Sequence, residues 1–157
     1  MARLIALLLF LAPHGAAAET IEGNVIRVAN GDTLTIMDAR NREHTVRLAE
    51  IDAPEMKQAF GAQSRQSLSA LCFKKPAQIE WREKDPNGRY IGQVMCAGVN
   101  ANAEQVRRGL AWVSPRFTKP GSPLYEIEAY ARFREIGLWA DSHSIPPWEW
   151  RARKAAR

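Results

Sequence analysis

The dipeptide Asn30-Gly31 constrains the fold of this chain more than any other feature. It separates two segments rich in strand-forming residues, 21–28 and 33–37. Asn and Gly both tolerate a positive φ angle, and this pair between two such segments is the strongest short-range signal for a β-hairpin. The sequence therefore predicts a tight hairpin, with Asp32 just past its turn.

Three further segments have the composition of short strands. Residues 44–49 follow the hairpin, and residues 77–81 and 90–96 are joined by a charged turn that contains Pro and Gly. Successive side chains of a strand point to opposite faces, so Arg47, which lies between two apolar residues, points away from the core. Arg89 stands where the second hairpin begins its return.

Three stretches carry helix signals. Residues 62–73 are polar and helix-prone with an apolar face. Asn102 is a candidate N-cap for a second helix, and Ser122 followed by Pro123 predicts the start of a third that ends at Gly137.

This order of elements predicts an α+β domain with five strands and about three α-helices. One helix between the third and fourth strands fits a Greek-key barrel of the oligonucleotide-binding type, the OB-fold. The chain has 157 residues, enough for one well-buried core. We expect a signal peptide at 1–18, one domain at 19–145, and a C-terminal strap with a basic tail at 146–157.

The first 18 residues have the three parts of a secretory signal peptide. Arg3 precedes the apolar run 4–13, and three alanines end at Ala18. About ten apolar residues are too few to span a bilayer, which takes roughly 20. We expect a secreted or periplasmic mature protein that is not membrane-bound. Cleavage removes Arg3, so 22 basic residues fall to 21 against 17 acidic ones, a formal charge of +4 that suits a polyanionic partner.

Two cysteines, Cys72 and Cys96, remain after the signal peptide. In an oxidising compartment an even pair usually forms a disulfide, although two buried free thiols are the alternative. A bridge over this loop is expected to stabilise the fold by about 3 kcal/mol.

Three carboxylates and two guanidiniums have the chemistry for holding a cation and a phosphodiester together. Asp32 and Asp52 can bind a hard cation, and Glu55 can accept a proton from water. Arg47 and Arg89 can bind phosphate oxygens with two parallel hydrogen bonds. Each residue alone also has an ordinary explanation, in a turn, at a helix start or on a solvated strand.

Zinc is disfavoured by what the sequence lacks. His44 and His143 are isolated, and the cysteines do not have the spacing of zinc ligands. Oxygen ligands favour calcium or magnesium, and the number of carboxylates does not separate the two.

Three separated stretches together resemble the staphylococcal nuclease (thermonuclease) family. They are residues 28–33, 46–55 and 85–89, and the similarity continues through 106–111 to 137–139. The resemblance implies a five-stranded OB-fold barrel and calcium-dependent cleavage of DNA and RNA at the bond between phosphorus and the 5′ oxygen, which leaves a 3′-phosphate and a 5′-hydroxyl.

The resemblance also assigns roles to residues. One calcium ion is bound by Asp32, Asp52 and the backbone carbonyl of Ala53, Glu55 is the general base, and Arg47 and Arg89 contact the scissile phosphate. Ala53 stands where the family often has Thr, and Asn87, Pro115 and Phe117 stand where relatives often have Tyr. These departures concern affinity and base preference more than the chemical step.

We expect a monomer that acts on single-stranded or frayed DNA and RNA, and no stable protein partner is implied. Two rival hypotheses stay open. One is a barrel that binds nucleic acid without cleaving it, which usually requires the loss of a catalytic side chain. The other is a disulfide-stabilised interaction domain whose charged residues only solvate its surface.

Overall fold

The computed structural model describes residues 18–156, so the predicted signal peptide lies almost entirely outside the described residues. Within that range no helix is long and apolar enough to cross a membrane. The elements in chain order are β1 (Glu19–Asn30), β2 (Thr33–Met37), β3 (Glu43–Leu48), β4 (Ile51–Asp52), α1 (Gly61–Cys72), β5 (Pro76–Lys84), β6 (Tyr90–Cys96), β7 (Val99–Asn100), α2 (Ala101–Arg107), β8 (Trp112–Val113), α3 (Pro123–Phe133), the 3-10 helix η1 (Gly137–Ala140) and α4 (Pro147–Ala155).

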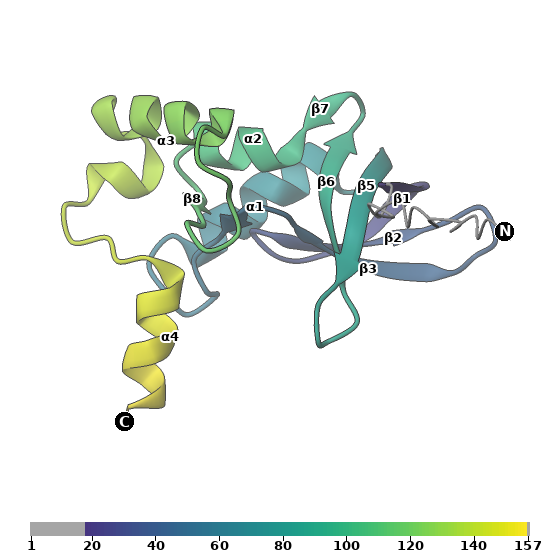
Figure 1. Ribbon diagram of the computed structural model, residues 1–157, viewed down its shortest axis with the longest axis horizontal. Coiled ribbons are helices and arrows are strands. Elements are labelled where there is room, and N and C mark those ends of the chain that lie inside the picture. Colours follow the sequence, from purple (N-terminus) through teal and green to yellow (C-terminus); the bar gives the residue numbers. More distant parts are fainter. Residues whose placement is uncertain (1–17, 157) are drawn as a thin grey trace, which may run out of the picture.

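Five strands close into a barrel (Figure 1). Antiparallel neighbours run in the order β3-β2-β1-β5-β6, and a parallel pairing of β3 with β6 closes the ring. Closure leaves these strands without a long free edge. The predicted α+β fold with a five-stranded OB-fold barrel is confirmed, with four α-helices in the described range instead of about three.

Side chains along each strand point alternately into and out of the barrel, and the inward-pointing ones are mostly apolar. Val46 and Leu48 of β3 are fully buried, whereas Arg47 between them is only partly buried and points to the other side. Leu34, Ile36, Ile79 and Val94 from other strands are also fully buried. One strand thus contributes both to the core and to the outer surface where Arg47 lies.

Two helix boundaries differ from the prediction. The N-cap of α2 is Asn100, whose side chain accepts a hydrogen bond from the Ala103 N–H, whereas Asn102 lies inside the helix and is fully buried. Ser122 does cap α3, as predicted, but that helix ends at Phe133. Gly137 instead begins η1 with a φ of +60°, where a Cβ atom would overlap the backbone around Gly109.

Asn102 has a structural task that explains its burial. Its amide donates to the carbonyl oxygens of Ala49 and Gly92, and its side-chain oxygen accepts from the Val94 N–H. The side chain therefore joins α2 to β6 and to the end of β3. As an N-cap it would have bonded only to the backbone of its own helix.

The C-terminal segment, predicted as a strap with a basic tail, forms helix α4. Pro147 at the first helical position, Glu149 in the first turn, and Arg153 and Lys154 in the last turn are all favourable for a helix. Trp148 packs edge-on against Trp112, with ring centroids 6.0 Å apart. Figure 1 shows α4 projecting from the rest of the molecule.

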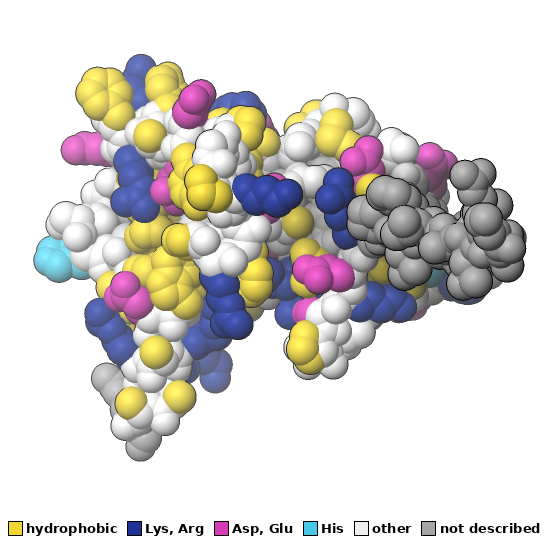
Figure 2. Space-filling model, viewed as in Figure 1, with side chains coloured by type: hydrophobic (Ala, Val, Ile, Leu, Met, Phe, Trp, Pro, Cys, Tyr) yellow, Lys and Arg dark blue, Asp and Glu magenta, His cyan; other side chains and the backbone are white. Residues whose placement is uncertain are grey.

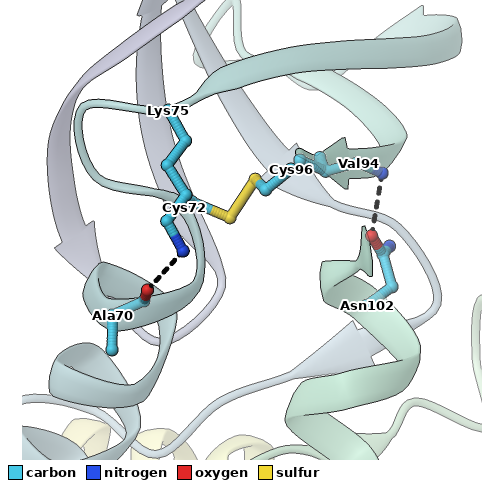
Figure 3. Close-up of a disulfide and its surroundings, with 6 residues drawn as sticks. All are labelled: Ala70, Cys72, Lys75, Val94, Cys96 and Asn102. Atoms are coloured by element: carbon cyan, nitrogen blue, oxygen red, sulfur yellow. Dashed lines mark hydrogen bonds between the residues drawn. A yellow bond between two sulfur atoms is a disulfide. The ribbon is translucent and has the colours of Figure 1, made fainter. Parts of the chain in front are cut away.

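The predicted disulfide is present. Cys72 at the end of α1 is bonded to Cys96 at the end of β6, closing a sequence separation of 24 residues (Figure 3). The bridge fixes the first helix to the barrel beside the point where the chain leaves the sheet.

Candidate active site

The first hairpin places Asp32 inside its turn. Asn30 pairs with Thr33, so Gly31 and Asp32 are the two turn residues, one position later than predicted. Neither Asn30 nor Gly31 has a φ angle in the left-handed region. Glycine is needed here for space, because a Cβ on Gly31 would overlap the Ser64 side chain of α1. The turn is therefore packed directly on the first helix.

Asp32 is buried and firmly held. Its Oδ2 accepts a hydrogen bond from the Ala53 N–H at 3.0 Å, and its Oδ1 accepts one from the Thr33 hydroxyl at 2.8 Å. Burial raises the pKa of Asp32; the Ala53 N–H and the Arg47 guanidinium oppose that rise, and the nearby Asp52 carboxylate adds to it. A bound cation would favour the charged form of such a group.

Asp52 lies on the short strand β4, which pairs with β8 through Trp112. Its side chain is 6% exposed, and its Oδ1 lies 3.7 Å from the Arg47 Nη2. The same Arg47 nitrogen donates to the Ile51 carbonyl at 3.4 Å. Strands β3 and β4 thus bring a guanidinium and a buried carboxylate together.

Arg89 is positioned by the turn that precedes β6. Its Nε donates to the Asp85 Oδ2 at 2.6 Å, and the Asp85 Oδ1 accepts from the backbone N–H groups of Asn87 and Arg89. Burial alone would raise the pKa of Asp85, but the hydrogen bonds from Arg89 and Asn87 lower it. The Asp-Pro-Asn-Gly turn therefore sets the direction of the Arg89 side chain.

All five candidate side chains line one cleft of about 560 Å³: Asp32, Arg47, Asp52, Glu55 and Arg89. One side of the cleft is formed by the β5–β6 turn and another by α4. Figure 2 shows a hollow between these two projections, with Lys and Arg side chains gathered around α4. Phe117 and Asn87, two of the departures from the family pattern, also line it.

The structure adds Arg151 of α4 to this site, although the sequence predicted only a strap with a basic tail at 146–157. Its Nη1 donates to Asp52 Oδ1 at 3.2 Å and to Glu55 Oε1 at 2.8 Å, and its Nη2 donates to Asp52 Oδ2 at 2.7 Å. The hydrogen bond with Asp52 is the main cause that raises the pKa of Arg151. The Pro147 and Glu149 helix-start pattern was the available signal for an ordered segment here.

Comparison with known proteins agrees with this geometry. A family model described as "Staphylococcal nuclease homologue" matches residues 45–141. The chain belongs to the staphylococcal nuclease family.

Curated relatives of this staphylococcal nuclease family member match along most of its length. An "Uncharacterized endonuclease" of Escherichia coli O157:H7 is 39% identical, covering 98% of this chain and 100% of that protein. A "Micrococcal nuclease" of Shigella flexneri is 40% identical over 82% of this chain and 79% of its own length. An "Uncharacterized endonuclease" of Haemophilus influenzae is 36% identical over 94% of this chain and 83% of its own length.

The oxygen donors of this family member suit a hard cation. In residues 18–156 no three side chains of His, Cys, Asp or Glu converge as a metal site. Asp32 and Asp52 line the cleft with carboxylate oxygens, and Ala53, which follows Asp52 in the chain, has a backbone carbonyl. Calcium accepts six to eight oxygen ligands, including carbonyls and waters, so these three groups would supply only part of its coordination.

Proposed function

We propose that this protein is a calcium-dependent nuclease that hydrolyses phosphodiester bonds of DNA and RNA. A nucleic-acid hydrolase is the activity that its family and the names of its relatives support. The observation that carries the proposal is the convergence of five side chains from separate segments on one cleft. We further propose cleavage between phosphorus and the 5′ oxygen, leaving 3′-phosphate and 5′-hydroxyl ends.

Arg47 and Arg89 are the proposed phosphate ligands. Arg47 is 14% exposed and Arg89 is 30% exposed, so both guanidiniums are partly removed from water while they still face the cleft. Partial burial strengthens a charge-assisted hydrogen bond to a phosphate oxygen. The two side chains come from neighbouring strands, because Arg47 of β3 pairs with Ile91 of β6, two residues after Arg89, and they would grip the phosphate that is being cleaved.

Glu55 is the proposed general base. Its side chain is 38% exposed and lines the cleft, so a water molecule can reach it. A carboxylate in this position can orient that water and accept its proton as the water attacks phosphorus. Arg47 and Arg89 would stabilise the negative charge that develops on the phosphate oxygens.

Asp32, Asp52 and the Ala53 carbonyl are the proposed ligands of one calcium ion. When bound, the ion would supply positive charge beside the phosphate oxygens. The burial and raised pKa of Asp32 support this role, because a carboxylate that is costly to ionise alone gains from a cation partner. The chain's own contribution is to hold the Asp32 carboxylate with the Ala53 N–H and the Thr33 hydroxyl, and to position Asp52 through the pairing of β4 with β8.

We propose single-stranded or frayed DNA and RNA as substrates of a monomer. Phe117 is 55% exposed beside the cleft, with its ring centroid 5.9 Å from the Arg47 Cζ, and an unpaired base can stack on such a ring. The Cys72–Cys96 disulfide supports a secreted or periplasmic location for the mature protein.

Cleavage of a single-stranded oligonucleotide by the purified protein tests the proposal, with calcium and then with excess chelator. We expect cleavage only with calcium, products ending in 3′-phosphate, and no cleavage by an Asp52→Asn variant that stays folded. If the oligonucleotide binds but remains intact with every metal tried, the protein is the non-catalytic binding module instead. If the protein shows no salt-sensitive binding to the oligonucleotide and no metal dependence, the interaction-domain hypothesis is favoured.

A further inference from the structure

Helix α4 places a positive charge on the side chains that the proposed function assigns to the cation and the base. Arg151 bonds both oxygens of Asp52 and one oxygen of Glu55, at 2.7 to 3.2 Å. The Asp52 side chain is 6% exposed, so these hydrogen bonds take up the accessible part of its carboxylate. Arg151 itself remains 47% exposed and so can be reached by solvent.

A cation at Asp52 and Arg151 in this position compete for the same carboxylate. Asp52 can ligate a cation only through an oxygen that now accepts a hydrogen bond from Arg151. A divalent ion at that oxygen would also lie within a few ångströms of the guanidinium, and like charges repel strongly at that distance in a partly buried site. Each positive group therefore weakens the binding of the other, and a cation bound at Asp52 favours release of Arg151.

The attachment of α4 allows Arg151 to be the group that leaves. The helix is fixed near its start, where Gln58 Nε2 donates to the Ile145 carbonyl at 2.7 Å and Trp148 packs against Trp112. Residues 151–156 are all exposed, and Figure 1 shows the helix extending away from the barrel. A helix of nine residues has little stability of its own, so losing the Arg151 contacts should free its second half.

We propose that α4 is a built-in competitor of the cation: Arg151 holds Asp52 and Glu55 until a divalent ion displaces it. This inference rests on the proposed function, because it uses the same cation site. A bound cation then weakens the docking of α4 by the same factor by which docked α4 weakens the affinity for the cation. The site would fill at a cation concentration set partly by the strength of the Arg151 contacts.

Arg151→Gln tests the proposal through calcium affinity, measured by titration calorimetry on the full-length mature protein. Arg153 is the matched control, because it lies on the same helix and pairs only with Glu149 among the described residues. Arg153→Gln removes the same charge without touching the cleft. Hydrogen exchange of the α4 amides, with and without calcium, provides a second readout that does not depend on activity.

We expect Arg151→Gln to bind calcium about tenfold more tightly than wild type, within the usual 5- to 150-fold range of coupling between sites, and Arg153→Gln to bind like wild type. Calcium should speed exchange in α4 of the wild-type protein. Equal affinity of all three proteins, or slower exchange in α4 with calcium, overturns the inference while the calcium-dependent nuclease stands. If neither wild type nor Arg151→Gln binds calcium, both the inference and the calcium part of the proposed function fail.

Discussion

The cleft has two walls of different construction. On the barrel wall, Asp32 is 5% exposed and Asp52 is 4% exposed, and the Asp32 carboxylate accepts a hydrogen bond from the Ala53 backbone. On the α4 wall, Arg151 is 47% exposed and extends from a helix whose last residues face solvent. The first wall is built from the barrel, its β1–β2 turn and the β4–β8 pair, and the second is joined to it by a few contacts near residues 145–148.

This difference suggests that the two walls of the cleft have different functions. Groups that must keep a fixed geometry during a reaction belong on elements that open only when the whole domain unfolds. A group that must move aside belongs on an element that can detach at little cost. The barrel wall therefore suits the chemistry, and the α4 wall suits control of access.

Glu55→Gln tests the chemistry on the barrel side and should have the largest effect. Gln cannot accept the proton of the attacking water, so we expect the cleavage rate to fall by about 10²- to 10⁴-fold while the fold and calcium binding persist. Single-turnover rates and calcium titrations would measure this. Glu126→Gln, on the exposed surface of α3, is the control. Near wild-type turnover of Glu55→Gln would rule out Glu55 as the base.

Arg89→Lys should be the next most severe change. Lysine cannot reproduce a forked contact with phosphate, nor the Arg89 Nε hydrogen bond to Asp85 that orients the side chain. We expect a rate loss of about 10²- to 10³-fold, as for removal of one donor to a developing oxyanion. Arg134→Lys at the end of α3 serves as the control. A rate within a few fold of wild type would show that Arg89 does not clamp the phosphate.

Removing the disulfide tests whether the bridge contributes to the stability of the fold without affecting the cleavage rate. Replacing Cys72 and Cys96 by Ala releases a loop of 24 residues, so the free energy of unfolding should fall by about 3 kcal/mol. Urea denaturation measures this loss, and the cleavage rate at 25 °C should stay near wild type. A large rate loss in a variant that remains folded would show that the bridge also positions the site.

Asp32→Asn tests whether the charge of Asp32 lowers the free energy of unfolding. The pKa of Asp32 is raised in the fold, so its contribution to stability is complete below the ordinary value of 3.8 and is lost as pH rises through the native pKa. In excess chelator at pH 7, the variant should therefore have a larger free energy of unfolding in urea than wild type. The gain should shrink as pH falls toward 4. A less stable variant at pH 7 would contradict this account.

The barrel wall was largely predictable from the sequence and the α4 wall was not. Asn30-Gly31, the alternation around Arg47 and the turn before Arg89 are local patterns, and local patterns determine hairpins and strand faces. The exact turn position and the inner role of Asn102 depended on packing against α1 and β6, which periodicity does not encode. Arg151 lies 99 residues from Asp52 in the chain, and only the folded structure brings the two together.

The most direct test of this account is the rate of oligonucleotide cleavage as a function of calcium concentration, for wild type and Arg151→Gln. The account predicts calcium-dependent cleavage by both proteins, the same maximal rate, and half-saturation at about tenfold lower calcium for the variant. A lower maximal rate with unchanged half-saturation would place Arg151 in the chemistry with the barrel residues. Cleavage that is independent of calcium in both proteins would contradict the proposed site.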